Sequence, residues 1–228
     1  KAAAAPDLRK ASLQALGEQL RQELAPVLAW QADSSDPDMM VRRRQYNDTE
    51  YLFAVNDKRT YGDYVGHHRL VMEKGLPHQA TLSIRRPGAS VYDLLDSRAV
   101  AVRATATGVE WEASLGPGEG RVYMVTPRPV ADVRLAVAQR RPADRAVAAR
   151  ASVVDPDGNP LAAVVPVRVD ILDPAGAPAE FSGYYGARDG ALDLRLDLAS
   201  NDAPGTWTVR IRELASGRTA EGTFEYRP

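Results

Sequence analysis

Hydrophobic side chains recur every three or four positions in the first part of the chain, between Pro6 and Trp30. Because an α-helix repeats every 3.6 residues, this spacing predicts an amphipathic helix. Pro6 suits the first turn, and Pro26 is expected to kink or shorten the last one. We expect the apolar stripe to pack on the following sheet or on an upstream domain, and a helix that binds a partner is the alternative. The stripe consists of Leu8, Leu13, Leu16, Leu20, Leu24, Val27 and Leu28.

From Met39 onward the hydrophobic period changes to two, which is typical of β-strands. Turn sequences rich in Pro, Gly, Asn and Asp separate the strands, for example Pro87-Gly88. Many short strands at this spacing favour antiparallel sheets over a parallel α/β sheet. The predicted strands are Met39–Gln45, Tyr51–Asn56, Gln79–Arg85, Val91–Leu95, Val109–Ala113, Arg121–Val125, Val130–Val137, Ala146–Val154, Val164–Leu172, Leu192–Leu198, Thr206–Glu213 and Thr219–Tyr226.

The predicted fold is therefore mostly β, with the amphipathic helix followed by two antiparallel β-sandwich domains. A polar connector at 31–38 follows the helix, and the stretch 140–144 resembles an interdomain joint. These features predict a helical lead-in and connector at 1–37, a first β-sandwich at 38–140 and a second at 145–228.

Composition narrows the classes of function. The chain has 228 residues, 44% hydrophobic and 26% charged, which is ordinary for a globular protein. A net charge of -1 from interspersed charges gives no sustained field to attract nucleic acid. No apolar run approaches the ~20 residues that span a bilayer, so no membrane insertion is expected, and the start of the sequence lacks a signal-peptide pattern. The absence of cysteine excludes disulfides, thiol nucleophiles and cysteine-bound zinc.

The stretch from Val41 to Val125 resembles the C-terminal accessory β-sandwich that follows the catalytic barrel in many large bacterial glycoside hydrolases. The resemblance rests on VRRRQYNDTEYLFAVND at 41–57, SVYDLL at 90–95 and SLGPGEGRVYMV at 114–125. The catalytic carboxylates of that family lie in the barrel, which this sequence does not contain. The resemblance therefore implies an accessory domain and carries over no catalytic residue.

The stretch from Ala146 to Arg227 is similar to the immunoglobulin-like domains of bacterial surface proteins and α-macroglobulins. The matching segments are VVDPDGNPLAAVVPVRVDILDPAG at 153–176, DGALDLRL at 189–196 and NDAPGTWTVRIREL at 201–214. The resemblance implies that Trp207 packs into the core and that Gly205 begins its strand. The macroglobulin thioester needs a cysteine, so that chemistry is excluded.

One cluster of residues could contact a ligand. Tyr61, Tyr64, His67 and His68 lie in a predicted loop beside charged residues from 57 to 63. Exposed tyrosines can stack on sugar rings, which makes this loop a candidate glycan contact. The alternative is a packed loop fixed by hydrogen bonds of the tyrosine hydroxyls. Adjacent histidines in a strand would point to opposite faces, which argues against a shared metal site.

The remaining candidates for chemistry have ordinary structural interpretations. Asp155, Asp157 and Asn159 are spaced like the first ligands of a calcium loop, but the following prolines break that pattern and favour a structural turn. Glu110 and Glu112 share one face of a strand, within the several-ångström range that the paired carboxylates of glycosidases use, yet such faces are usually exposed to solvent. The sequence contains no G-x-S-x-G nucleophile elbow. We therefore predict no catalytic residue, no metal and no cofactor.

The sequence thus predicts a non-catalytic accessory region of a larger glycoside-hydrolase-like bacterial protein located outside the cytoplasm. Its predicted partner is an upstream domain of the same polypeptide. A carbohydrate-binding module, with a polysaccharide as ligand, is the first alternative. A protein–protein adhesion module is the second, because immunoglobulin-like domains carry many unrelated functions.

Overall fold

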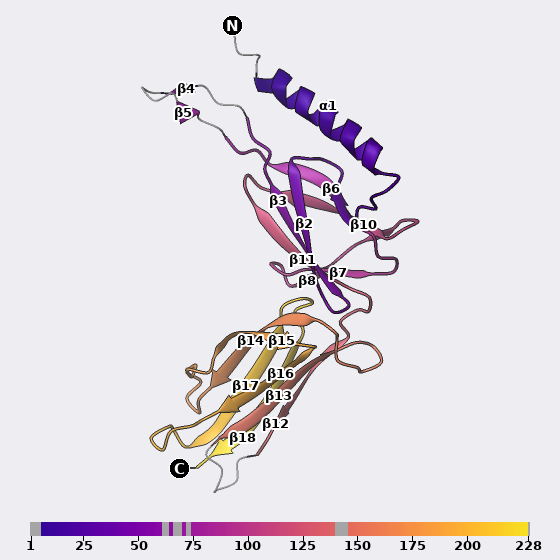
Figure 1. Cartoon of the computed structure of the whole chain (residues 1–228). Coiled ribbons are helices and arrows are strands. Elements are labelled where there is room, and N and C mark those ends of the chain that lie inside the picture. The colour runs from indigo at the N-terminus through magenta and orange to yellow at the C-terminus, as the bar shows by residue number, and fades with distance from the viewer. Residues whose placement is uncertain (1–5, 61–63, 66–69, 72–73, 140–145, 228) are drawn as a thin grey trace. The chain divides into compact units, whose positions relative to one another are not determined.

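The computed structural model describes residues 6–60, 64–65, 70–71, 74–139 and 146–227. They form one helix and a series of β-strands (Figure 1). The elements are α1 (Pro6–Leu24), β1 (Ala32–Ser34), β2 (Met39–Tyr46), β3 (Thr49–Asn56), β4 (Tyr64–Val65), β5 (Leu70–Val71), β6 (His78–Ile84), β7 (Ser90–Asp93), β8 (Arg98–Val100), β9 (Arg103–Ala104), β10 (Val109–Leu115), β11 (Gly120–Thr126), β12 (Asp132–Val137), β13 (Val147–Val154), β14 (Val164–Leu172), β15 (Gly183–Arg188), β16 (Ala191–Leu196), β17 (Gly205–Glu213) and β18 (Thr219–Tyr226).

The strands form antiparallel sheets, which confirms the prediction of a mostly β chain with an N-terminal helix. Their orders are β1-β6-β10-β9, β2-β3-β11-β7-β8, β12-β13-β16-β15-β14-β17-β18 and β4-β5. Each predicted strand corresponds to an observed one, with ends that differ by a few residues. The prediction omitted β1, β4, β5, β8, β9 and β15.

Helix α1 ends at Leu24, six residues earlier than the sequence predicts. Pro26 lacks an amide hydrogen, and a turn with hydrogen bonds from Val27 and Leu28 to the carbonyl of Leu24 replaces the last helical residues. The expected packing of the apolar stripe on the sheet is not seen. Leu13 and Leu16, for example, expose 62% and 51% of their surface.

The chain divides into two compact units. The first contains residues 1–43, 52–88 and 102–121, and the second contains 44–51, 89–101 and 122–228. The predicted domain boundaries stay a prediction. In the first unit, Trp111 lies directly opposite Leu82 in the β10–β6 pair, and both side chains are buried. The alternation of buried and exposed residues along these strands gives the unit its apolar core.

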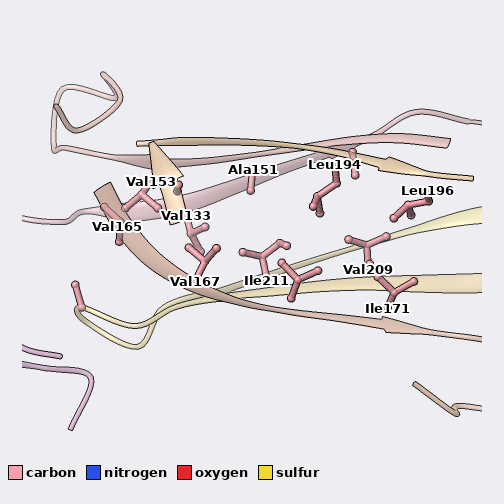
Figure 2. Packing of buried hydrophobic residues seen from close by; sticks show 14 of the residues in the cluster. Val133, Ala151, Val153, Val165, Val167, Ile171, Leu194, Leu196, Val209 and Ile211 are labelled. Carbon is pink, nitrogen blue, oxygen red and sulfur yellow. The ribbon is translucent and has the colours of Figure 1, made fainter. Parts of the chain in front are cut away.

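The seven-stranded sheet encloses the core of the second unit. Figure 2 shows aliphatic side chains pointing between two layers of strands. Val165, Val167, Val169 and Ile171 of β14 are completely buried, at every second position. Trp207 lies in the same core, stacked against Phe224 with ring centroids 6.0 Å apart, and its indole N–H donates to the carbonyl of Ala203.

The two edge strands of this sheet, β12 and β18, contact each other, so the sheet nearly closes into a barrel. Gly222 of β18 permits this approach, because a Cβ there would lie 2.8 Å from Cγ2 of Val137. The side-chain amide of Gln139 donates to the carbonyl of Thr223 across the same contact, 3.1 Å away. Closure leaves little edge exposed to another chain.

Tyrosines join the earlier segments of the second unit to its large sheet. The Tyr51 hydroxyl donates to the carbonyl of Val164 (2.8 Å) and accepts from the amide of the same residue (2.9 Å). The Tyr92 hydroxyl accepts from the amide of Val130 (2.7 Å). Burial raises the pKa of both tyrosines, so they remain neutral hydroxyls at physiological pH.

The carboxylate of Glu213 organises the turn between β17 and β18. It is fully buried and accepts hydrogen bonds from the amides of Ala215 (2.8 Å), Ser216 (3.0 Å) and Arg218 (2.8 Å) and from the Ser216 hydroxyl. Hydrogen bonds to a charged acceptor are stronger than neutral ones, and they offset the cost of burying this charge.

We expect Glu213→Gln to lower the free energy of unfolding by about 2–4 kcal/mol, because its NH₂ group would face backbone donors and leave them unsatisfied. Urea unfolding followed by circular dichroism measures the loss. Glu221→Gln, an exposed change on β18, is the control and should cost less than about 0.5 kcal/mol. Equal stability of the two variants would show that Glu213 does not stabilise the turn.

Candidate functional site

The predicted glycan-contact residues belong to the segment between β3 and β6, which carries the small β4–β5 pair (Figure 1). Tyr61, His67 and His68 lie outside the described residues. Tyr64 is in β4, where its backbone pairs with Val71, but its side chain is outside the description. The proposed contact of these four residues with a glycan therefore stays a prediction.

The two ends of this segment are fixed to the first unit by Asn56. Its buried side-chain amide donates to the carbonyls of Leu76 and Gly116, both at 2.7 Å, and its Oδ1 accepts from the amide of Lys58 at 2.9 Å. The amide of Leu76 in turn donates to the carbonyl of Lys58. The Asn56 side chain thus joins the start of the segment after β3, the end of the segment before β6 and the turn between β10 and β11.

A polar triad lies beside Asn56. The ammonium of Lys58 is 3.1 Å from Nδ1 of His78, and Nε2 of His78 is 3.3 Å from a carboxylate oxygen of Asp36. An ammonium can only donate, so Nδ1 of His78 is the acceptor in its contact with Lys58. His78 is buried, so this arrangement fixes the base of the segment and leaves the imidazole little access to a substrate.

Asn56→Ala should lower the free energy of unfolding by about 2–3 kcal/mol, because buried carbonyls and the Lys58 amide lose their partner. Chemical unfolding and hydrogen exchange at Lys58 and Leu76 measure the effect. Gln79→Ala, a change of an exposed β6 side chain, is the control. Unchanged exchange at both amides would contradict the role assigned to Asn56.

The two glutamates proposed as paired carboxylates both have partners on the sheet surface. Glu110 forms an ion pair with Arg103, and Glu112 accepts a hydrogen bond from the Thr81 hydroxyl at 2.7 Å. Glu112 is exposed. The Glu110 side chain is only 18% exposed, so the expected exposure to solvent is found for Glu112 and not for Glu110, and the absence of catalysis stays a prediction.

The turn considered as a calcium loop is organised by Asp155 and Arg128. Oδ1 of Asp155 accepts from the amides of Asp157 and Asn159, both at 2.9 Å, and Arg128 forms ion pairs with the carboxylates of Asp155 and Asp157. The guanidinium supplies the positive charge that a cation would otherwise bring. Across the described ranges, no group of three or more His, Asp or Glu side chains is placed to hold a metal ion.

The pKa of Asp155 is lowered. Burial alone would raise this pKa, but the amides of Asn159 and Asp157 and the charge of Arg128 together reverse the shift. When the pKa of a carboxyl group is lower in the folded state than in the unfolded state, its ionised form stabilises the fold at pH values above the unfolded-state pKa. This stabilisation is lost as the pH falls through the folded-state pKa.

Asp155→Asn should therefore reduce the dependence of stability on pH below about pH 4, where the wild-type carboxylate becomes protonated. Unfolding midpoints in urea between about pH 2 and pH 6 provide the measurement. Asp173→Asn is the matched control, because Asp173 accepts similar turn bonds at 2.9 and 2.8 Å and forms no ion pair in the part of the chain that the structure describes. If the unfolding midpoints of Asp155→Asn and wild type depended on pH in the same way, the lowered pKa of Asp155 would be contradicted.

Sequence reasoning missed the exposed aromatic side chain on β15. Tyr184 exposes 75% of its surface and lies on a strand that was not predicted. The segment GYYGAR has no extended hydrophobic alternation, because glycines occupy two of its six positions. A pair of tyrosines between Gly183 and Gly186 was the available signal.

Comparisons with known proteins give little further information. No family model matches the chain, and no curated protein matches it. Two crystal structures of the Parabacteroides merdae β-glucuronidase are similar to it at low level. The one with glycerol in the active site has 11% identity and a TM-score of 0.30, covering 80% of this chain and 28% of that one. The other has 12% identity and a TM-score of 0.29, covering 80% and 29%.

This chain therefore spans less than a third of the length of those enzymes. At such TM-scores the likeness carries no weight for fold or function, which have to rest on the residues themselves. In the described ranges, no helix has the length and apolar character needed to cross a membrane.

Proposed function

We propose that this chain is a non-catalytic accessory region of a larger glycoside-hydrolase-like bacterial protein that works outside the cytoplasm. In this proposal the first β domain supports an upstream domain of the same polypeptide, and the second acts as a spacer or docking module. The observation that carries the proposal is the exposed leucine face of α1, defined here as Leu13, Leu16, Leu20 and Leu24, whose side chains expose 62%, 51%, 48% and 42% of their surface.

The contacts that hold α1 to the first unit are polar. Lys10 forms a 2.5 Å ion pair with Asp38, and Arg21 forms an ion pair with Asp33. The Arg21 guanidinium also lies 5.0 Å from the ring centroid of Trp30. Helices in proteins gain most of their stability from packing an apolar face, and this face is exposed to solvent. An apolar surface of another domain would supply the missing cover.

Groups capable of chemistry also have structural partners in this chain. Glu213 and Asp155 each hold a turn in place through their carboxylate oxygens, and Nδ1 of His78 contacts the ammonium of Lys58. Such use suits a supporting domain better than a catalytic one. We also propose that both β domains are β-sandwiches and that the second is immunoglobulin-like. Its two facing layers (Figure 2) support this proposal, as does the burial of Trp207.

The test compares this chain with the longer polypeptide that the proposal requires. Replacing Leu16 and Leu20 by Ser should leave the unfolding midpoint of this chain within about 1 °C, because the two side chains are exposed here. The same change should lower the midpoint of the longer protein by about 2–4 °C, as expected for a loss of ~1 kcal/mol or more from an apolar interface.

Gln14→Ser and Gln22→Ser, on the polar side of α1, form the control pair. Equal midpoints for all variants of the longer protein would refute the docking role of the leucine face. Hydrolysis of chromogenic glycosides by this chain alone would refute the non-catalytic assignment.

A further inference from the structure

The outer surface of the second unit carries a polar patch across β15, β14, β17 and β18. Arg168 lies directly opposite Tyr184 on one side and Arg212 on the other. In the next row on the same face, Arg210 lies opposite Asp170 and Glu221. We call this surface the Tyr184 face, and it consists of Tyr184, Arg168, Asp170, Arg210, Arg212 and Glu221.

Tyr184 provides an open aromatic surface at one side of this face. It exposes 75% of its surface, about twice the exposed fraction of the adjacent Tyr185 at 36%, whose hydroxyl donates to the carbonyl of Phe181 at 2.7 Å. The next residue of β15 on the same face as Tyr184 is Gly186, which has no side chain to cover the ring. A flat ligand can therefore approach the tyrosine ring from solvent.

Two arginines of the face are held in fixed positions. Nε and Nη2 of Arg168 both lie 3.0 Å from Oδ1 of Asp170, and Nε and Nη2 of Arg210 both lie 2.8 Å from Oε2 of Glu221. Asp170 and then the Tyr184 side chain raise the pKa of Arg168, so its charge is constant at physiological pH. The pair with Asp170 holds the guanidinium of Arg168 in place on the strand next to Tyr184 before any ligand arrives.

The face has an excess positive charge, with three arginines against two carboxylates. Arg212 is exposed and, among the residues that the structure describes, forms no ion pair. It lies directly opposite Arg168, although like charges at opposed positions of a sheet destabilise it. An anionic ligand bound between the two guanidiniums would relieve this repulsion.

We propose that the Tyr184 face binds an acidic saccharide, with Tyr184 stacked on a sugar ring and the carboxylate of the sugar bound by Arg168 and Arg212. The face also carries the carboxylates of Asp170 and Glu221, and acidic residues are depleted at the core of protein–protein interfaces. A sugar ring needs an aromatic platform and hydrogen-bond donors, and the face provides both. This assignment does not depend on the proposed accessory role.

The test is isothermal titration of the 228-residue chain with a hexamer of galacturonic acid, and with cellohexaose as a neutral counterpart. We expect millimolar or tighter binding of the acidic hexamer, weakened by added NaCl, and at least ~tenfold weaker binding of cellohexaose. Tyr184→Ala should weaken binding of the acidic hexamer by about tenfold or more, and Arg212→Gln by about threefold to tenfold.

Arg195→Gln, a change of an exposed arginine of β16 that forms an ion pair with Asp197, should leave affinity unchanged. Since the replaced side chains are exposed, circular dichroism and unfolding midpoints should be the same for all variants. No binding of the acidic hexamer at about 10 mM, or binding unaffected by Tyr184→Ala, would overturn the proposal. Equal affinity for cellohexaose, or preferential binding of a glutamate-rich peptide that depends on Tyr184, would overturn it as well.

Discussion

The fold depends on the burial of every second side chain between antiparallel strands. In β14, the valines at 165, 167 and 169 point into the core, while Arg168 and Asp170 stay at the surface. A register shift of one residue would bring the charged residues into the core and the valines into water, which gives the register a strong energetic preference. The outer face of the sheet is then free to vary, and it carries the exposed tyrosine and arginines.

Such a sheet also needs hydrogen-bond partners for the backbone groups of its turns and edges. Glu213 binds the amides of the last tight turn, and Gly222 lets the final strand approach the first strand of the same sheet. Gly190, with a φ of 70°, lies where a Cβ would meet the backbone of Leu161 at 2.6 Å. These residues contribute little apolar area, yet each fixes a position where the regular alternation stops.

Much of the fold could be predicted because alternation is a local property of the sequence. The run from Thr206 to Glu213 shows it directly, since Trp207, Val209 and Ile211 are buried and the arginines between them are exposed. Strand β1 was missed because it is short, and β15 because glycines interrupt it. Both are strands because they pair with neighbouring strands, and their own sequences do not show it. The leucine stripe of α1 was recognised, but whether a stripe is covered depends on tertiary contacts.

The candidate site was less predictable, because its geometry also depends on tertiary contacts. The roles of Asn56 and His78 arise from contacts with residues twenty or more positions away, and the sequence does not show which residues these are. Strand pairing alone brings Arg168 next to Tyr184 and Arg212 next to Arg168. The tyrosines and histidines of the segment 61–68 could be recognised as a cluster, but composition does not specify their geometry.

Native-state hydrogen exchange on the 228-residue chain tests the central claim most directly, namely that the buried β cores hold the molecule and that the polar contacts of α1 protect this helix only weakly without a further partner. The account predicts that the slowest amides lie in β13, β14 and β17 and exchange only by global unfolding, while those of α1 exchange with almost no protection. Protection of α1 as strong as that of β14 would contradict it.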